Sequence, residues 1–144
     1  IFRTAGSKWD RYTYDFERVI QSGMNLKYNS IKQHFVHQVP WIETDLFDDY
    51  YRELIDKGYT VKGYSDLHEL SHYYQQTYDP IYSSILNRGF DPHQKLTVFI
   101  DRNGGVIFTK DGNHRLYMAM VMGMRFIPFH VGGIHEQTVI HEAV

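Results

Sequence analysis

The chain has 144 residues, a net charge of −2 and no cysteine. This length is enough for a single domain with a hydrophobic core, which we expect over residues 1–144. The net charge disfavours nonspecific binding of duplex DNA, which requires a basic excess. The absence of cysteine excludes disulfides, thiolate zinc sites and thiol nucleophiles. No apolar run has the length of a transmembrane helix, so we expect a cytoplasmic protein with no membrane partner.

The first part of the chain, residues 1–64, is predicted to be a mostly helical N-terminal extension. Residues 23–30 are predicted to form a loop. Further along, apolar residues at helical spacing predict a helix that Thr44 or Asp45 caps and Gly58 ends. Its apolar residues are Leu46, Phe47, Tyr50, Tyr51, Leu54 and Ile55. The acidic residues at its start are explained by the helix dipole, which favours negative charge there.

Two further helices are predicted before the first strand. Ser65 or Asp66 is the expected N-cap of the first helix. Asp79 and Pro80 predict the start of the second helix, because Asp is favoured at the N-cap and Pro at the first helical position. Gly89 is expected to end it.

A β-hairpin, a helix and a last strand follow. Apolar runs predict strands at Leu96–Ile100 and Val106–Phe108, and Asn103-Gly104 between them supplies the positive φ angles of a tight hairpin turn. A helix is predicted over residues 116–123 and a strand over residues 126–131. This order predicts an α/β (α+β) fold, in which helices pack against a small mixed β-sheet.

The turn at residues 109–115, Thr-Lys-Asp-Gly-Asn-His-Arg, carries the main functional signal. It links a strand to a helix, and a helix N-terminus attracts anions because its first N–H groups are unpaired and the dipole is positive there. Asp111 is expected to cap the helix, and Gly112 permits a close approach. His114 and Arg115 fall in the first turn, where a cation opposes the dipole. A bound anion would remove this conflict.

Each residue of the turn has a functional and a structural interpretation. Arg115 is a candidate phosphate ligand, because a guanidinium binds phosphate with two parallel hydrogen bonds, or it forms an ion pair with Asp111 or Asp101. His114 is a candidate phosphate donor or acid–base group, or a packing residue. Asn113 is a candidate ligand for substrate oxygens.

A histidine metal cluster is a weaker hypothesis. His130 and His135 flank two glycines, and with His114 they supply three nitrogen ligands. Sequence spacing does not show that the three converge, so we assign no metal ligand.

The same turn resembles the signature of the ParB/sulfiredoxin superfamily. The matching residues are Asp111-Gly112-Asn113-His114-Arg115-Leu116, Ala119, Gly123 and Ile127-Pro128, with Leu67, Leu70, Ile81-Tyr82-Ser83-Ser84-Ile85 and Gly89 upstream. The resemblance implies a ParB/sulfiredoxin-like core over residues 65–135.

Within the superfamily, the turn is closest to the DGHHR-like turn of free serine kinases. That resemblance implies catalytic roles for Asp111 and His114, and ligand-binding roles for Gly112, Asn113, His114 and Arg115. CTP-binding members carry a Glu-Arg-Arg type sequence at the matching place. Sulfiredoxins need a cysteine where Asn113 stands, which excludes their activity here.

The expected function is therefore binding of a nucleotide or another phosphorylated small molecule. The resemblance implies ATP, ADP or CTP with Mg²⁺ as cofactors, and phosphotransfer or nucleotide hydrolysis as the reaction. Two alternatives stay open: a non-catalytic protein-interaction module, and a DNA-associated ParB-like nuclease. The net charge argues against the nuclease, and we expect no strong nucleic-acid binding.

Overall fold

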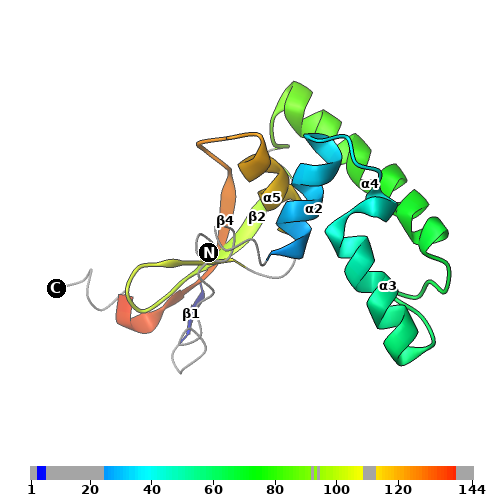
Figure 1. Cartoon of the computed structure of the whole chain (residues 1–144). Coiled ribbons are helices and arrows are strands. Elements are labelled where there is room, and N and C mark those ends of the chain that lie inside the picture. Colours follow the sequence, from blue (N-terminus) through cyan, green and yellow to red (C-terminus); the bar gives the residue numbers. More distant parts are fainter. Residues whose placement is uncertain (1–2, 6–24, 92, 94, 109–112, 139–144) are drawn as a thin grey trace.

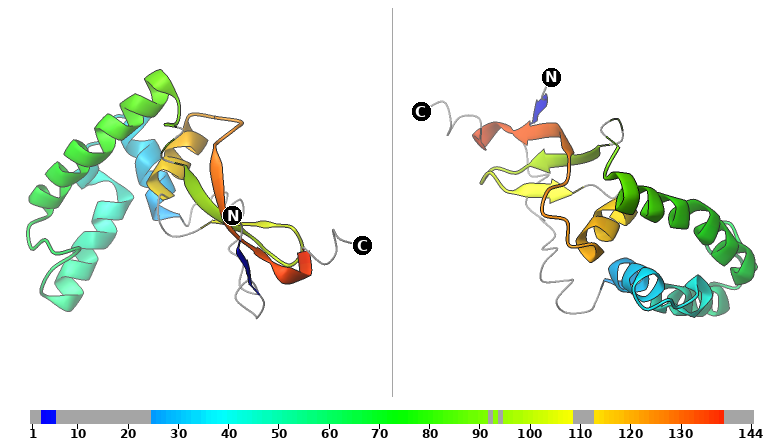
Figure 2. Two further views of the ribbon diagram at one scale, coloured as in Figure 1. Left: turned by 180° about the vertical axis from the view of Figure 1, so that it is seen from behind. Right: turned by 90° about the horizontal axis from the view of Figure 1, so that it is seen from above.

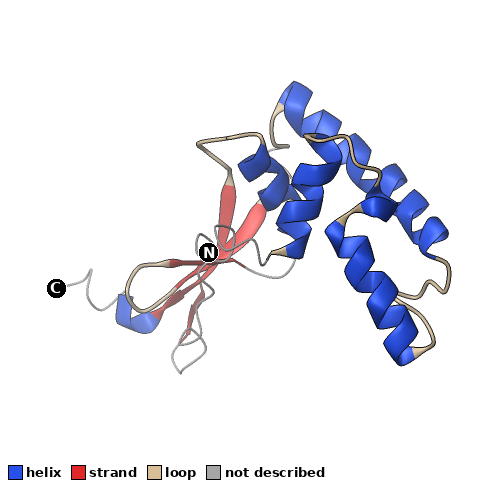
Figure 3. Cartoon of the chain, in the orientation of Figure 1, coloured by secondary structure: helices blue, strands red, loops and turns tan. Residues whose placement is uncertain are grey.

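The computed structural model describes residues 3–5, 25–91, 93, 95–108 and 113–138 of the chain. Its elements are β1 (Arg3–Ala5), α2 (Leu26–Phe35), the 3₁₀ helix η1 (Trp41–Glu43), α3 (Asp45–Lys57), α4 (Leu67–Arg88), β2 (Leu96–Ile100), β3 (Val106–Phe108), α5 (Asn113–Val121) and β4 (Phe129–His135). Helices α2, α3 and α4 gather on one side, the strands lie on the other, and α5 lies between them (Figures 1, 2 and 3). The predicted mixed α/β class is confirmed.

The four described strands form one mixed sheet in the order β1-β4-β2-β3. Strands β2 and β3 pair antiparallel, with Val98 opposite Phe108 and Ile100 opposite Val106, so the predicted hairpin is confirmed. Strand β4 runs parallel to both β1 and β2. Sequence analysis did not predict β1.

The hairpin turn differs from the predicted one. Asn103 does not have the positive φ that the sequence predicted for it. Among the described residues of the turn, Gly104 alone has a positive φ, at 81°. The Asp101 carboxylate accepts hydrogen bonds from the N–H groups of Asn103, at 2.8 Å, and Gly105, at 2.7 Å. This side-chain bonding stabilises a longer turn than the two-residue type that the sequence predicted.

Strand β4 begins three residues later than the predicted strand at 126–131 and continues through both glycines to His135. Pro128 has no N–H to donate to a ladder, which is consistent with a start just after it. The pairing with β2 shifts at Gly132, which is an extra residue and forms a bulge. A Cβ there would lie 2.9 Å from the Thr97 side chain, so the bulge requires glycine.

Helix α3 confirms the predicted helix and its ends. Thr44 occupies the N-cap position but makes no side-chain cap hydrogen bond, because its hydroxyl donates to the Trp41 carbonyl, and Gly58 ends the helix in the left-handed conformation with φ 73°. Its buried face is narrower than predicted, because Tyr51 and Ile55 are exposed. The buried residues are Leu46, Phe47 and Tyr50.

Helix α2 replaces most of the loop predicted at residues 23–30. Asn25 caps it by accepting a 2.9 Å hydrogen bond from the Tyr28 N–H. Ile31 and Ser30 are buried, and the Ser30 hydroxyl accepts a 2.9 Å bond from the Leu46 N–H at the start of α3. Packing against other helices therefore stabilises a segment whose own pattern is weakly helical.

Helix α4 is one continuous helix, whereas two were predicted with a break at Asp79 and Pro80. Asp66 caps it and Gly89 ends it, as predicted. A proline inside a helix removes one hydrogen bond and costs about 3 kcal/mol. Burial of Tyr74 before the proline and Ile85 after it in one hydrophobic cluster offsets this cost.

Eleven buried residues form a hydrophobic cluster that draws on α2, η1, α3, α4 and α5. It contains Ile31, Trp41, Leu46, Phe47, Tyr50, Val61, Leu70, Tyr74, Ile85, Tyr117 and Met118. Residues on both sides of position 64 therefore share one core. Within the described part of the chain, no helix combines the length and apolar character needed to cross a membrane.

Candidate functional site at the first turn of α5

Helix α5 begins at Asn113, so His114 and Arg115 lie in its first turn, as predicted. Arg115 is partly buried there. Asp111 and Gly112 lie outside the described residues, and so does the Asn113 side chain. The structure therefore describes the side chains of two of the five predicted site residues, His114 and Arg115.

Burial on several sides fixes helix α5 in the molecule. Four consecutive residues are buried: Leu116, Tyr117, Met118 and Ala119. The helix closes on Gly123, with φ 70°, where the Gly123 N–H donates to the Met120 carbonyl and the Met124 N–H to the Ala119 carbonyl. This pair of bonds is a Schellman motif, which satisfies carbonyls at the helix end. The first turn is thus held on a rigid support.

The His114 ring packs between tyrosines of α4. It stacks on Tyr78 with ring centroids 4.1 Å apart and an angle of 16° between the planes, and it meets Tyr74 edge-on at 6.2 Å. Its Nε2 atom is buried and has no hydrogen-bond partner among the described residues. Such a nitrogen costs about 1–3 kcal/mol unless a partner is supplied.

Burial, together with the charges of Lys27 and Lys62, lowers the pKa of His114 to about 4. The ring is therefore neutral at pH 7 and is a weak base. A neutral imidazole donates one hydrogen bond and accepts another. This state suits a ligand-binding group better than the acid–base catalyst that was the other sequence-based candidate.

Two lysines near His114 were not among the predicted site residues. Lys27 lies in the first turn of α2, and Lys62 lies in the connection between α3 and α4. Burial lowers the pKa of Lys27, and Lys62 lowers it further. Neither lysine forms an ion pair with another described residue.

Contacts of Tyr50 and Tyr74 lead from Lys62 to His114. The Lys62 Nζ lies 5.9 Å from the Tyr50 ring centroid, and the Tyr50 and Tyr74 hydroxyls are 2.8 Å apart. Burial raises the pKa of Tyr50 to about 12 and that of Tyr78 to about 12, so both hydroxyls are neutral at pH 7. On the side of α2, the Asn25 amide donates to the Tyr117 hydroxyl at 2.8 Å.

A local signal for Lys27 exists in the sequence. Asn25 is a favourable N-cap, and Lys27 two residues later opposes the dipole of α2 in the same way as Arg115 opposes that of α5. No comparable local signal marks Lys62, because it reaches this site through the packing of α3 on α4.

The hypothesis of a histidine metal cluster finds no support. His130 is exposed and His135 is buried, both on β4, and the searched, described residues contain no group of three potential ligands that could hold a metal ion. Asp101, one candidate partner of Arg115, uses its carboxylate within the hairpin turn.

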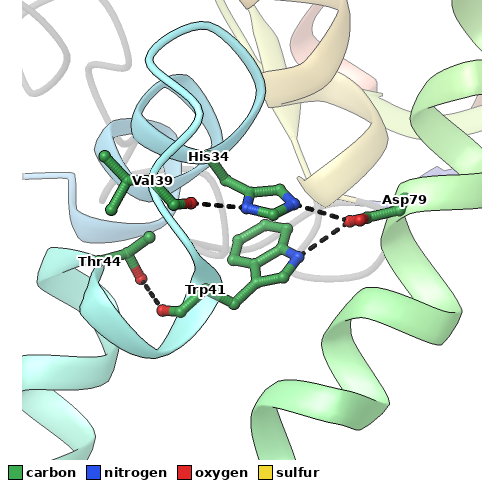
Figure 4. A network of polar contacts seen from close by, with 5 residues as sticks. All are labelled: His34, Val39, Trp41, Thr44 and Asp79. Atoms are coloured by element: carbon green, nitrogen blue, oxygen red, sulfur yellow. Dashed lines mark hydrogen bonds and ion pairs between the residues drawn. The ribbon is translucent and has the colours of Figure 1, made fainter.

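A second histidine lies in a different environment, where α2 meets α4 (Figure 4). The His34 Nδ1 is hydrogen-bonded to the Val39 carbonyl oxygen at 2.7 Å, and its Nε2 lies 3.0 Å from the Asp79 carboxylate. The Trp41 indole N–H donates to the same oxygen at 2.9 Å, and its ring stacks on His34 at 4.2 Å. The Asp79 carboxylate, which the sequence predicted to cap a helix, therefore contacts His34 and Trp41 instead.

Comparison of the chain with protein-family models, curated proteins and solved structures finds no match. The case for a functional site therefore rests on the residues themselves: a neutral histidine whose Nε2 has no hydrogen-bond partner among the described residues, two lysines that form no ion pair with another described residue, and the first turn of α5.

Proposed function

We propose that the protein binds a nucleotide or another phosphorylated small molecule at the first turn of α5, in a ParB/sulfiredoxin-like fold. Arg115 binds a phosphate through its guanidinium, and His114 donates a hydrogen bond to a phosphate oxygen. Binding is the core of the proposal. A phosphotransfer or hydrolysis reaction would in addition require Asp111 as a base and Mg²⁺ to shield the phosphate charge.

One observation carries the proposal: the buried His114 Nε2 has no hydrogen-bond partner among the described residues, and the positive charges of Lys27 and Lys62 act on its ring. A phosphate offers acceptor oxygens to the nitrogen and negative charge to the cations. It is also favoured by the free N–H groups at a helix N-terminus. A cation or an apolar ligand would satisfy neither requirement.

The first experiment is a thermal-shift screen with ATP, ADP, CTP, GTP and pyrophosphate, with and without Mg²⁺. Calorimetric titration then compares the selected ligand on wild type and Arg115→Ala. Loss of a charge-assisted contact, about 1.5–3 kcal/mol, should weaken binding roughly tenfold to a hundredfold. Arg115→Lys should recover only part of the affinity, because an ammonium lacks the planar fork.

The matched control is Arg125→Ala, which removes the same charge from an exposed position after α5. It should leave affinity within twofold. If Arg115→Ala binds as tightly as wild type, the site lies elsewhere. If Arg115→Ala unfolds in denaturant far more easily, the arginine is a structural residue and the proposal loses its main ligand.

A further inference from the structure

We infer that a groove along the first half of α4 binds an extended, basic peptide segment of a partner protein. This α4 groove is separate from the proposed phosphate site, because none of its lining residues belongs to α5. The segment places an apolar side chain at one end of the groove, a lysine or arginine at the rim of that end, and its backbone against glutamine side chains at the other end.

Two cavities, of about 410 and 400 Å³, form the α4 groove. Ile42 lines both, so they lie on either side of this residue. Helix α4 supplies one wall: Leu67 lines the first cavity, and Ser71 and Gln75 line the second. Residues four positions apart share one face of a helix, and eight positions span about 12 Å. This length accommodates about four residues of an extended chain.

The end of the groove that faces α3 is apolar. Phe47, Leu54 and Leu67 line it. Tyr51 lines it as well and is 57% exposed, and Ile55, one turn later on α3, is 62% exposed. Exposed apolar side chains that gather beside a cavity are typical of a surface that a partner covers. This end therefore suits an aliphatic or aromatic side chain of the bound segment.

The rim of the apolar end is acidic. Asp48 and Asp66 both line it and are exposed. Asp48 forms no ion pair with another described residue. Helix α3 as a whole carries five acidic and two basic residues, and one of the basic residues, Lys57, already pairs with Glu53 at 3.1 Å. A lysine or arginine of the partner is attracted to this rim, whereas a nucleic acid or an acidic peptide is repelled.

The other end of the groove offers hydrogen bonds. Gln38 and Gln75 line it, and their side-chain amides form no hydrogen bond with another described residue. His34 and Trp41 also line it, but their ring nitrogens are already bonded within the protein (Figure 4). A side-chain amide donates and accepts, which matches the N–H and C=O groups of an extended chain. A helical segment bonds these groups internally and would leave the glutamines unused.

Charge argues for a different protein as the occupant, rather than a second copy of this chain. Two copies that met through this face would bring two acidic α3 helices together. Like charges that face each other across an interface weaken binding and exclude such partners. A basic segment instead turns the same acidic side chains into a source of attraction. Charge complementarity therefore selects a basic partner.

The test is selection from a phage library of random ten-residue peptides on the purified chain, followed by fluorescence anisotropy of the strongest binder. The selected peptides should combine lysine or arginine with an apolar residue. Asp48→Lys should weaken binding by roughly fivefold, because it reverses one charge at the rim. Asp49→Lys is the matched control, since it makes the same change at an exposed α3 position that lines neither cavity, and it should stay within about twofold of wild type.

The apolar end is tested with the same peptide. Tyr51→Ser should weaken binding by roughly tenfold, because an aromatic contact at the cavity is lost. Tyr59→Ser removes the same side chain from a position that is 83% exposed and lines neither cavity, and it should bind as wild type does. Because the substituted side chains are exposed, thermal melts of the variants should match that of wild type.

Several outcomes would overturn the inference. Selection of acidic peptides, or of no peptide at all, would refute a basic occupant. Equal affinity losses in a variant and its matched control would show that binding does not use the α4 groove. Sedimentation that reveals a dimer, which Tyr51→Ser dissociates, would assign the groove to a second copy of the chain instead.

Discussion

The Tyr74 ring contacts both histidine regions: its centroid lies 5.3 Å from that of Trp41, which stacks on His34, and 6.2 Å from that of His114. At His34, both ring nitrogens have hydrogen-bond partners, and the neighbouring charge is the Asp79 carboxylate. At His114, Nε2 has no partner among the described residues, and the neighbouring charges are lysines. Both rings stack on an aromatic residue, so stacking does not distinguish them.

The difference separates a structural histidine from a candidate ligand-binding histidine. A polar group that is fully hydrogen-bonded within the protein stabilises the fold and has nothing left to offer a ligand. A buried nitrogen without a partner destabilises the empty protein and becomes satisfied when a ligand binds. The region around His34 should therefore control stability, and the region around His114 should control binding.

The largest expected effect is on stability at Asp79. Asp79→Ala removes the acceptor of both the His34 and the Trp41 N–H groups, and it should lower the free energy of unfolding by about 2–3 kcal/mol. Denaturant unfolding of wild type and variant measures this difference. Asp79→Asn keeps one acceptor oxygen and should cost less.

The control for Asp79 is Asp49→Ala, at an exposed position on α3, which should change stability by no more than about 0.5 kcal/mol. Pyrophosphate affinity of folded Asp79→Ala should equal that of wild type. A large loss of affinity with little loss of stability would reverse the roles assigned to the two histidines.

The next effect is the pH dependence of stability that His114 causes. Its pKa is about 4 in the folded protein and near 6.5 when unfolded, so the unfolded chain binds more protons between these values. The stability that depends on a neutral His114 is fully present above pH 6.5, and about 2.5 kcal/mol of it is lost when the pH falls to 4.5. Denaturant unfolding at pH 7, 6, 5 and 4.5 measures the loss.

His114→Phe keeps the stacking on Tyr78 and removes the titrating group. As the pH falls, the stability of wild type should therefore fall more than that of the variant, so the advantage of the variant should be larger at acidic pH than at pH 7. At pH 7 the variant should be at least as stable as wild type, because the unpaired nitrogen is gone. Parallel pH curves for the two proteins would contradict the neutral, unpaired state of His114.

The smallest effect concerns the tyrosine pair beside both regions. Tyr50→Phe leaves the buried Tyr74 hydroxyl without its 2.8 Å partner and should cost about 1 kcal/mol. In a double-mutant cycle with Asp79→Ala, the two losses should add within about 0.5 kcal/mol. A larger coupling energy would show that Tyr74 transmits changes between the two histidine regions, and the comparison would have to treat them as one unit.

Local signals in the sequence determined the elements whose ends depend on adjacent residues. Gly58 ends α3 and Gly89 ends α4 because a glycine accepts a positive φ at low cost, whatever the rest of the fold does. The strands of the hairpin followed from their apolar runs. The position of His114 and Arg115 in the first turn of α5 followed from the strand–turn–helix order.

Tertiary structure decided what depends on residues far apart in the chain. Asp79 and Pro80 carry a strong local signal for a helix start, yet α4 continues, because the Asp79 carboxylate binds His34 and Trp41 and the flanking residues are buried. The three-residue strand β1 likewise carries no local signal that predicts its pairing with β4. The grouping of Lys27 and Lys62 around His114 belongs to the same class, since like charges converge only where packing of the intervening helices forces them together.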